Sequence, residues 1–322
     1  MVIKLDLKDK KVLTLLDEDS TLSNSQIAKK VQLSKPAIEY RIQRLLKNKA
    51  IFEFYTVIDF GKLGYQQYKI YFKFQNLSIE EEKRILNYWA NDKNSVWLAQ
   101  VRGRWDLAVS VLAKNNYDFG LVLNKFLEKF SKFVLEKDIL LTEYSLIYSR
   151  EYLADKKENS KEFVYGIPSK IYELDETDKK ILKEISVNAR INIVDLAEKT
   201  KLSRDVVNYR IKKLTKEKII TGYRCFLNLE NIGLRYYKLI IRTKNFDEKA
   251  ETKLKQFISS HKKATQFLKL IGSWDLEIEF EVETSDELYE NLNQIRKDFA
   301  DIIKEYEVLK ITKTLKYNFF PF

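Results

Sequence analysis

The sequence predicts an α+β chain made of two tandem copies of one unit, in which three short helices precede a β-α-β-β-α-β segment. Two observations support this prediction. An internal repeat runs through the chain with one offset, and each copy changes from helical to strand periodicity at the same point. The 322 residues, 45% hydrophobic and 33% charged, suffice for about two folded domains.

The repeat has a constant offset of 169 residues. It relates Leu5–Leu13 to Leu174–Leu182, and the four residues from Gly103 to Asp106 to the four from Gly272 to Asp275. Because the register holds over about a hundred residues without a net insertion, we interpret the chain as a duplication.

Each copy begins with three helix-start signals. In the first copy these are Asp6 with Asp9, Ser23 with Gln26, and Ser34, whose side chains can accept hydrogen bonds from free N–H groups of a first helical turn. The third helix has one apolar stripe, and only two residues separate it from the second helix. Three short helices joined in this way predict a winged-type helix-turn-helix domain. The stripe residues are Ile38, Ile42 and Leu45, and in the second copy Val207, Ile211 and Leu214.

Positive charge is concentrated on the third helices. The chain has a net charge of +11, and residues 34–49 and 203–218 each contribute +4 of it. Such clustering favours a surface that binds DNA phosphates, although a solvated Lys-rich helix is the alternative. Arg41 and Arg210 are ambiguous, because each can form a structural ion pair as readily as a phosphate contact. The candidate DNA-binding residues are Ser34, Lys35, Glu39, Tyr40, Arg41, Arg44, Ser203, Arg204, Asn208, Tyr209, Arg210 and Lys213.

The second part of each copy reads as β-α-β-β-α-β, which supports a ferredoxin-like domain. Residues 153–170 form a charged segment without hydrophobic period and are expected to be a solvated linker. We expect helix-turn-helix domains at residues 1–50 and 171–219, hinge strands at 51–65 and 220–234, and ferredoxin-like domains for effector binding and dimerisation at 66–152 and 235–322.

One strand of the second copy is strongly acidic. Period-two alternation places the five acids from Asp275 to Glu283 on one face, beside a strand that carries Lys238, Arg242 and Lys244. A ladder of ion pairs is the preferred interpretation. A metal or cationic-ligand site is the alternative, although a hard cation usually takes carboxylates that converge from several elements.

These motifs, taken in order, resemble the leucine-responsive/asparagine-related (Lrp/AsnC, or feast/famine) family of prokaryotic regulators. The resemblance is carried by Leu174-Asp175-x-x-Asp178, by Leu202-Ser203 followed by Tyr209-Arg210-Ile211, by Gly222-Tyr223, and by Gly272-x-x-Asp275. It implies transcriptional regulation, pairing through the sheets, and a small effector such as an amino acid. The resemblance places the effector at Gly103, Asp106, Gly272 and Asp275. Gln32 and Lys201 depart from the family, which often has glycine before the recognition helix.

Because most members carry one copy per chain, the sequence predicts a single-chain pseudo-dimer that pairs its two repeats and can associate into further homo-oligomers. Gly103 and Gly272 are in the first place hairpin-turn glycines, Trp105 and Trp274 are expected to pack across strands, and Asp106 and Asp275 either orient an amino group or cap the turn.

Other functions remain as alternatives. A siroheme-decarboxylase-like enzyme would share this architecture. The sequence, however, has one histidine, His261, and offers no nucleophile with a base, no Cys/His metal set and no phosphate loop. A non-specific architectural DNA-binding protein is the other possibility. We expect no cofactor, no membrane span and no signal peptide; with the single cysteine, Cys225, this favours a cytoplasmic protein.

Overall fold

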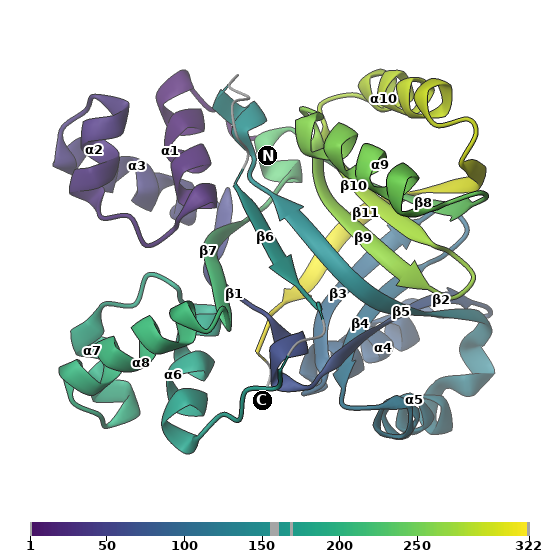
Figure 1. The fold of residues 1–322 in the computed structure, drawn as a ribbon, viewed down its shortest axis with the longest axis horizontal. Helices are drawn as coiled ribbons and strands as arrows, with labels where there is room; N and C mark the ends of the chain where they lie inside the picture. Colours follow the sequence, from purple (N-terminus) through teal and green to yellow (C-terminus); the bar gives the residue numbers. More distant parts are fainter. Residues whose placement is uncertain (1, 155–160, 168–169, 321–322) are drawn as a thin grey trace.

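A computed structural model describes residues 2–154, 161–167 and 170–320. Two three-helix bundles lie side by side at one end of the molecule, and a large strand assembly flanked by helices occupies the other end (Figure 1). The two bundles are built from α1 (Leu7–Glu18), α2 (Asn24–Val31) and α3 (Lys35–Lys47), and from α6 (Glu176–Val187), α7 (Ile193–Thr200) and α8 (Arg204–Lys216).

The helix starts agree with the expected caps. Asp6 and Ser23 each form a reciprocal capping box with the residue three positions on, and Ser34 accepts a hydrogen bond from the Ala37 N–H at the start of α3. Asn192 and Ser203 cap α7 and α8 in the same way. Because these are contacts within one helical turn, the local sequence is sufficient to set the helix boundaries.

A two-stranded antiparallel ribbon connects the bundles to the rest of the protein. It pairs β1 (Ile51–Ile58) with β7 (Ile220–Leu227), so the two expected hinge strands bind each other. Each bundle then packs on the strand of the other half. The Ser20 N–H donates to the Tyr223 carbonyl at 3.0 Å, and the Ala189 N–H donates to the Phe54 carbonyl at 2.8 Å. These two bonds are equivalent under the 169-residue offset.

The remaining strands form a closed ring in the order β2-β4-β3-β11-β8-β10-β9-β5, with β5 returning to β2. Each half supplies four neighbouring strands, and the halves join where β3 pairs with β11 and β5 pairs with β9. The strands are β2 (Gln66–Phe74), β3 (Ser95–Arg102), β4 (Leu107–Ala113), β5 (Val134–Tyr148), β8 (Arg235–Thr243), β9 (Ala264–Ile271), β10 (Leu276–Val282) and β11 (Ile303–Tyr317).

The four neighbouring strands of each half form one sheet. Helices cover the outer face of each sheet, and the inner faces of the two sheets pack on each other. In the first half α4 (Ile79–Asn91) and α5 (Asn116–Phe130) bury Trp89 and Phe126 against the sheet. In the second half α9 (Glu248–Ser260) and α10 (Ser285–Asp298) do the same. Trp105 and Trp274 lie in the core between the sheets, in agreement with the expectation that they pack rather than contact a ligand. Within the described residues, no helix is long and apolar enough to span a bilayer.

The segment expected as a solvated linker differs from that expectation where it is described. Residues Glu162–Tyr165 form β6, which pairs with the end of β5, and Phe163 and Tyr165 are both buried. Alternation of two aromatic residues over only four positions is too short a signal to separate from the charged run before it. Residues 155–160 of that run lie outside the described part of the chain. Short 3-10 helices are also present: η1 (Phe60–Leu63), η2 (Ser131–Phe133), η3 (Glu151–Ala154) and η4 (Glu230–Ile232).

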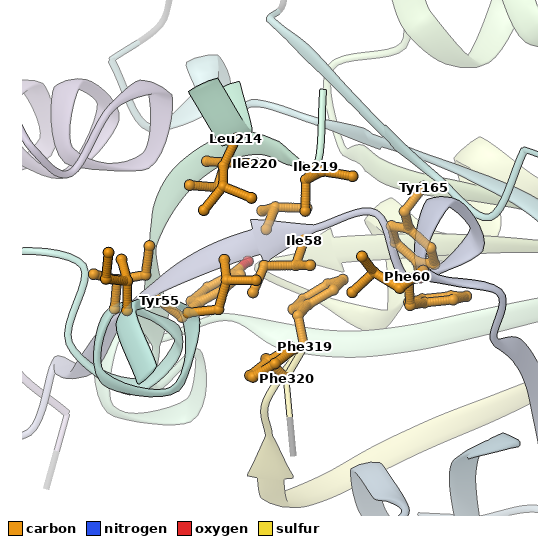
Figure 2. Packing of buried hydrophobic residues seen from close by; sticks show 14 of the residues in the cluster. Tyr55, Ile58, Phe60, Tyr165, Leu214, Ile219, Ile220, Phe319 and Phe320 are labelled. Atoms are coloured by element: carbon orange, nitrogen blue, oxygen red, sulfur yellow. The ribbon is translucent and has the colours of Figure 1, made fainter. Parts of the chain in front are cut away.

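Strand β6 completes an aromatic cluster beneath the ribbon. Figure 2 shows Tyr55 of β1, Tyr165 of β6 and Phe319 near the C-terminus converging there. The Tyr55 and Phe319 rings are stacked with centroids 5.7 Å apart, and Phe319 meets Tyr165 edge-on at 5.2 Å. The cluster therefore joins the second helix-turn-helix domain, the ribbon and the strand ring into one hydrophobic core.

The repeat is also visible in the backbone. All six described non-glycine residues with positive φ form three pairs separated by 169 positions: Gln32 with Lys201, Lys49 with Lys218, and Asn76 with Asn245. Gly103 and Gly272 likewise have φ of 132° and 149°, as expected for hairpin-turn glycines. A Cβ at Gly272 would lie 2.6 Å from the Leu140 side chain, so this turn also needs glycine for its close approach to β5.

Candidate nucleic-acid interface

Helices α3 and α8 present polar faces to solvent at equivalent positions of the two bundles. Their apolar stripes point inward, with Ile38 and Val207 fully buried. The opposite faces carry Tyr40 and Tyr209, which are 68% and 64% exposed although they are large aromatic side chains. Ser34, Lys35, Glu39, Ser203, Arg204 and Asn208 are also exposed. Most of the candidate DNA-binding residues are therefore accessible.

Arg41 and Arg210 have a structural role in this geometry. The Arg41 guanidinium donates to Asp6 at 2.8 Å and to Asp9 at 2.6 Å, and Arg210 binds Asp175 at 2.6 Å and Asp178 at 3.3 Å. The backbone N–H of Asp178 and the guanidinium of Arg210 together hold the pKa of Asp175 below its usual value. Each arginine thus ties the recognition helix to the start of the first helix of its bundle.

Two further candidates also have partners inside the protein. Arg44 pairs with Asp9, which is buried, and Lys213 lies over the Tyr172 ring at 5.3 Å. The net charge of α3 and α8 therefore overstates the charge that is free to meet phosphates. Among the described residues, the bases on these helices and directly after them that form neither an ion pair nor a contact with an aromatic ring are Lys35, Lys47, Lys49, Arg204, Lys212, Lys216 and Lys218.

The turn before each recognition helix keeps its geometry without glycine. Gln32 ends α2 and Lys201 ends α7, both in the left-handed region with φ of 58° and 57°. For an L-residue this conformation costs roughly 1 kcal/mol. The chain tolerates the departure from the family pattern rather than relaxing the turn.

The four candidate effector residues lie at the two hairpin turns, each packed against the other half's long strand. The Asp106 carboxylate accepts hydrogen bonds from the Phe74 N–H and the Lys73 ammonium, both at 2.9 Å. Asp275 accepts from the Thr243 N–H at 2.6 Å and from its hydroxyl at 2.8 Å. Both carboxylates therefore hold the strand that precedes α4 or α9, and a ligand ammonium would have to share them.

The acidic strand forms the ladder of ion pairs that was expected, but part of it lies across the interface between the halves, where Lys69 and Arg150 are its partners. Glu277 accepts from Lys69 of β2 and from Lys238 of β8, each at 2.5 Å, and from the Tyr71 hydroxyl at 2.7 Å. Lys238 also pairs with Glu279. The side chains of Lys69, Lys238, Glu277 and Glu279 are all buried. Arg242, expected in this ladder, instead binds the Ser273 carbonyl and Glu305.

The low dielectric of this interface shifts the titration of the ladder. Burial raises the pKa of Glu277, but Lys238 and Lys69 more than offset this and hold it at about 2. Burial lowers the pKa of Lys69 to about 8, against the opposing effect of Glu277. The carboxylate of Glu277 is therefore ionised at neutral pH and is needed to neutralise the lysines.

A second buried network, which sequence reasoning missed, connects the first helix-turn-helix domain to both halves. Asp17 of α1 binds Arg224 of β7 at 2.6 Å and Arg150, which follows β5, at 2.7 Å. Arg150 also binds Glu281 at 2.7 Å, and Glu281 accepts from the Tyr152 hydroxyl. The sequence contained a signal for this network, because at the offset of 169 each of these charged residues corresponds to a neutral residue in the other copy. The counterparts of Asp17, Arg224, Arg150 and Glu281 are Ser186, Tyr55, Phe319 and Leu112.

Comparisons with known proteins agree with this geometry. Residues 5–46 match the model of the AsnC-type helix-turn-helix domain, and residues 174–221 match a winged helix-turn-helix DNA-binding model. An HTH-type transcriptional regulator of Pyrococcus furiosus is 33% identical over 127 residues, which are 39% of this chain and 81% of that protein. A proline dehydrogenase transcriptional activator of Rhodobacter capsulatus is 38% identical over 85 residues, 26% of this chain and 53% of that protein.

The fold and the exposed helix faces thus define a helix-turn-helix protein with two DNA-binding domains. Within that class, the chain belongs to the Lrp/AsnC family of regulators. The solved structure of the siroheme decarboxylase NirDL shares the fold of the whole chain, with a TM-score of 0.61 over 97% of this chain and 93% of that one. At 13% identity, this likeness extends to the fold alone.

Proposed function

We propose that the protein is a sequence-specific transcriptional regulator in which one chain presents two different recognition helices to one operator. The observation that carries this proposal is the pair of solvent-facing tyrosines, Tyr40 and Tyr209, at equivalent positions of two linked bundles. Around them the residues differ. Glu39 can accept a hydrogen bond from cytosine, whereas Asn208, at the equivalent position, can bond adenine bidentately. The preferred operator should therefore be asymmetric.

Selection of binding sites from random DNA tests this proposal. We expect two dissimilar half-sites at a fixed spacing, and one chain per duplex by sedimentation of labelled DNA. A perfectly palindromic binding site would contradict the proposal of an asymmetric operator. Two chains per operator would contradict the single-chain pseudo-dimer. Retention without any sequence preference at physiological salt would favour the architectural alternative.

Buried charge supports the pairing of unlike halves. In the two networks, Asp17, Lys69 and Arg150 give the first half a charge of +1, while Arg224, Lys238 and three glutamates give the second half −1. Only pairing of the first half with the second is neutral, whereas two like halves would bury a net charge of +2 or −2. Because an uncompensated buried charge costs several kcal/mol, this interface favours the pairing of a first half with a second half, which the single-chain pseudo-dimer provides.

Effector modulation is a separate part of the proposal. The family resemblance points to the turns at Gly103–Asp106 and Gly272–Asp275, and an amino-acid screen by thermal shift tests it, because a ligand that binds only the native state raises the melting temperature. If Asp106→Asn and Asp275→Asn abolish the shift of a ligand that stabilises the parent protein, these turns are the effector sites. An unchanged shift would place the effector elsewhere.

The described residues do not favour the enzyme alternative. The chain's one histidine, His261, lies half-buried at the end of α9, where its ring contacts Phe257 and Phe280 on the helix-covered face of the second sheet. It is therefore on the opposite side of that sheet from the inward-facing polar groups. Haem-type absorption of the purified protein would reopen the siroheme-decarboxylase hypothesis.

A further inference from the structure

A cavity of about 720 Å³ lies between the ribbon and the strand ring. Its walls come from β7, from the segment that leads into β8, and from the start of β9. The inner face of β10 and the end of β11 complete them. This volume is within the range of sites that hold small organic ligands. Because β7 supports both helix-turn-helix domains through the ribbon and its contacts with α1, a molecule in this cavity would touch the part of the fold that positions the recognition helices.

The equivalent place in the other half is almost filled. A cavity of about 30 Å³ is lined by Phe60, Val96 and Ser110, whose counterparts at an offset of 169, Leu229, Thr265 and Glu279, line the large cavity. The small cavity has room for about one water molecule. Two aromatic rings that line the small cavity account for the difference: Tyr165 has no counterpart at this offset, and Phe319 corresponds to Arg150, which lines the large cavity (Figure 2).

The strand edges show the same asymmetry. Beyond its pairing with β2, the end of β5 is covered by β6, which pairs with Ser145–Tyr148. Beyond its pairing with β8, the equivalent edge of β11 has no strand partner among the described residues, and Thr312, Thr314 and Tyr317 line the large cavity there. The first half thus fills this position with aromatic rings of the chain itself, whereas the second half leaves it open.

The lining indicates the chemistry of the occupant. The Thr265 side chain is 97% buried, and its hydroxyl has no hydrogen-bond partner within the described residues. Lys310 and Lys313 on β11 form no ion pair there either, while the deeper Glu279 and Glu281 are already paired with Lys238 and Arg150. Six aromatic side chains complete the walls: Phe52, Tyr55, Trp97, Phe226, Tyr236 and Tyr317.

We propose that this cavity binds a multi-ring aromatic carboxylate and is an effector site of the regulator, separate from the two hairpin turns. The rings would stack among the six aromatic side chains, the carboxylate would meet the two free lysines of β11, and Thr265 would supply a hydrogen bond. The effector role rests on the proposed regulatory function. The binding site itself does not, because ligand binding can be measured without DNA.

Calorimetry and quenching of tryptophan fluorescence with 1-naphthoic acid and indole-3-acetic acid test the site on the full chain. We expect saturable binding with one ligand per chain, and at least tenfold weaker binding of cyclohexanecarboxylic acid. Thr314→Trp, which adds a ring inside the cavity, should abolish binding, whereas Lys304→Trp, on the exposed start of the same strand, should leave it unchanged. Equal binding by both variants, or no saturable binding by folded protein, would overturn the proposal.

A second variant does not depend on filling the cavity. Lys310→Ala with Lys313→Ala should weaken 1-naphthoic acid about tenfold and leave its neutral analogue 1-naphthylmethanol nearly unaffected, because only the carboxylate loses a partner. The same samples are then titrated with operator DNA. A ligand that binds in the cavity but does not change DNA affinity would overturn the effector role, while folded protein that binds no DNA either with or without the ligand would instead contradict the regulatory function.

Discussion

Asp17, in the first helix of the chain, and Arg224, in the ribbon strand of the second half, form a fully buried ion pair with 2.6 Å between Oδ2 and Nη2. The pair joins a DNA-binding domain to the other half of the molecule. Burial raises the pKa of Asp17, yet Arg224 and Arg150 outweigh it and hold that pKa below its usual value. At the equivalent place in the other half, Ser186 and Tyr55 form no such link.

Replacement of Asp17 by Asn should destabilise the protein strongly. The buried guanidinium of Arg224 and the mostly buried one of Arg150 would lose their shared carboxylate. Breaking a buried pair by removing one partner costs roughly 3–5 kcal/mol. Urea denaturation measures the change, with Asp301→Asn as an exposed control. If the free energy of unfolding falls by less than about 1 kcal/mol, the buried pair contributes no more than an exposed surface pair, and the prediction is wrong.

The buried ladder predicts that the free energy of unfolding falls steeply at acid pH. Because the pKa of Glu277 is about 2 in the folded protein and 4.5 is its ordinary value, its ionised form contributes roughly 3 kcal/mol above pH 4.5. This contribution should disappear as the pH falls from about 4.5 to 2. Denaturation curves at several pH values check it. Glu277→Gln should be less stable at pH 7 and should show a shallower decline, and an unchanged decline at acid pH would contradict the assignment.

The recognition faces predict two kinds of variant. Lys35→Ala and Arg204→Ala should each weaken DNA binding and lower the magnitude of the salt slope by about 1, without a change in stability. Arg41→Ala should instead lower stability, because Arg41 ties α3 to Asp6 and Asp9. Filter retention at several salt concentrations and thermal melting separate the two effects, with Lys297→Ala on α10 as the control. Equal salt slopes for Lys35→Ala and Lys297→Ala would exclude Lys35 from the interface.

Glycine at the turns before the recognition helices should stabilise the protein. Gln32→Gly and Lys201→Gly would each relieve a left-handed conformation and raise stability by roughly 0.5–1 kcal/mol. Gln43→Gly, exposed in the middle of α3, should cost about 1 kcal/mol instead. Thermal melting of the three variants decides, and destabilisation by both turn glycines would contradict the argument.

Two glycines with different surroundings should respond in opposite directions. A Cβ at Gly222 would lie 2.2 Å from the Phe163 ring, so Gly222→Ala must displace β6 and should cost more than about 1 kcal/mol. Gly120 is inside α5 with open space around its Cα, and Gly120→Ala should stabilise by about 1 kcal/mol. The proposal that β6 is firmly packed fails if Gly222→Ala leaves the melting temperature unchanged.

Much of the architecture was predictable from residues that are close in the sequence. The capping pairs at Asp6 and Ser23, the apolar stripe of α3 and the alternation of the strands are short-range signals, and the observed elements agree with them. Strands β1 and β7 cover the first eight residues of each expected hinge strand. The exposed faces around Tyr40 and Tyr209 followed from the same periodicity, because each buried stripe defines the face opposite to it.

Other features could not be predicted in this way. Arg41 was ambiguous because the identity of its partner depends on how α3 crosses α1, and only the packed bundle brings Asp6 and Asp9 to it. Strand β6 follows a charged segment and could not be predicted, because two aromatic residues form a strand only where the edge of another strand, here β5, is available for pairing.

The sequence alone determined the duplication, the order of the elements and the two polar helix faces, because repeats, caps and periodicity act over a few residues or by direct self-comparison. Only the tertiary structure decided which charges meet at the interface, which aromatic rings fill the small cavity and why the large one stays open. Those outcomes depend on contacts between residues more than a hundred positions apart, such as Lys69 with Glu277, and burial gives such contacts their energy.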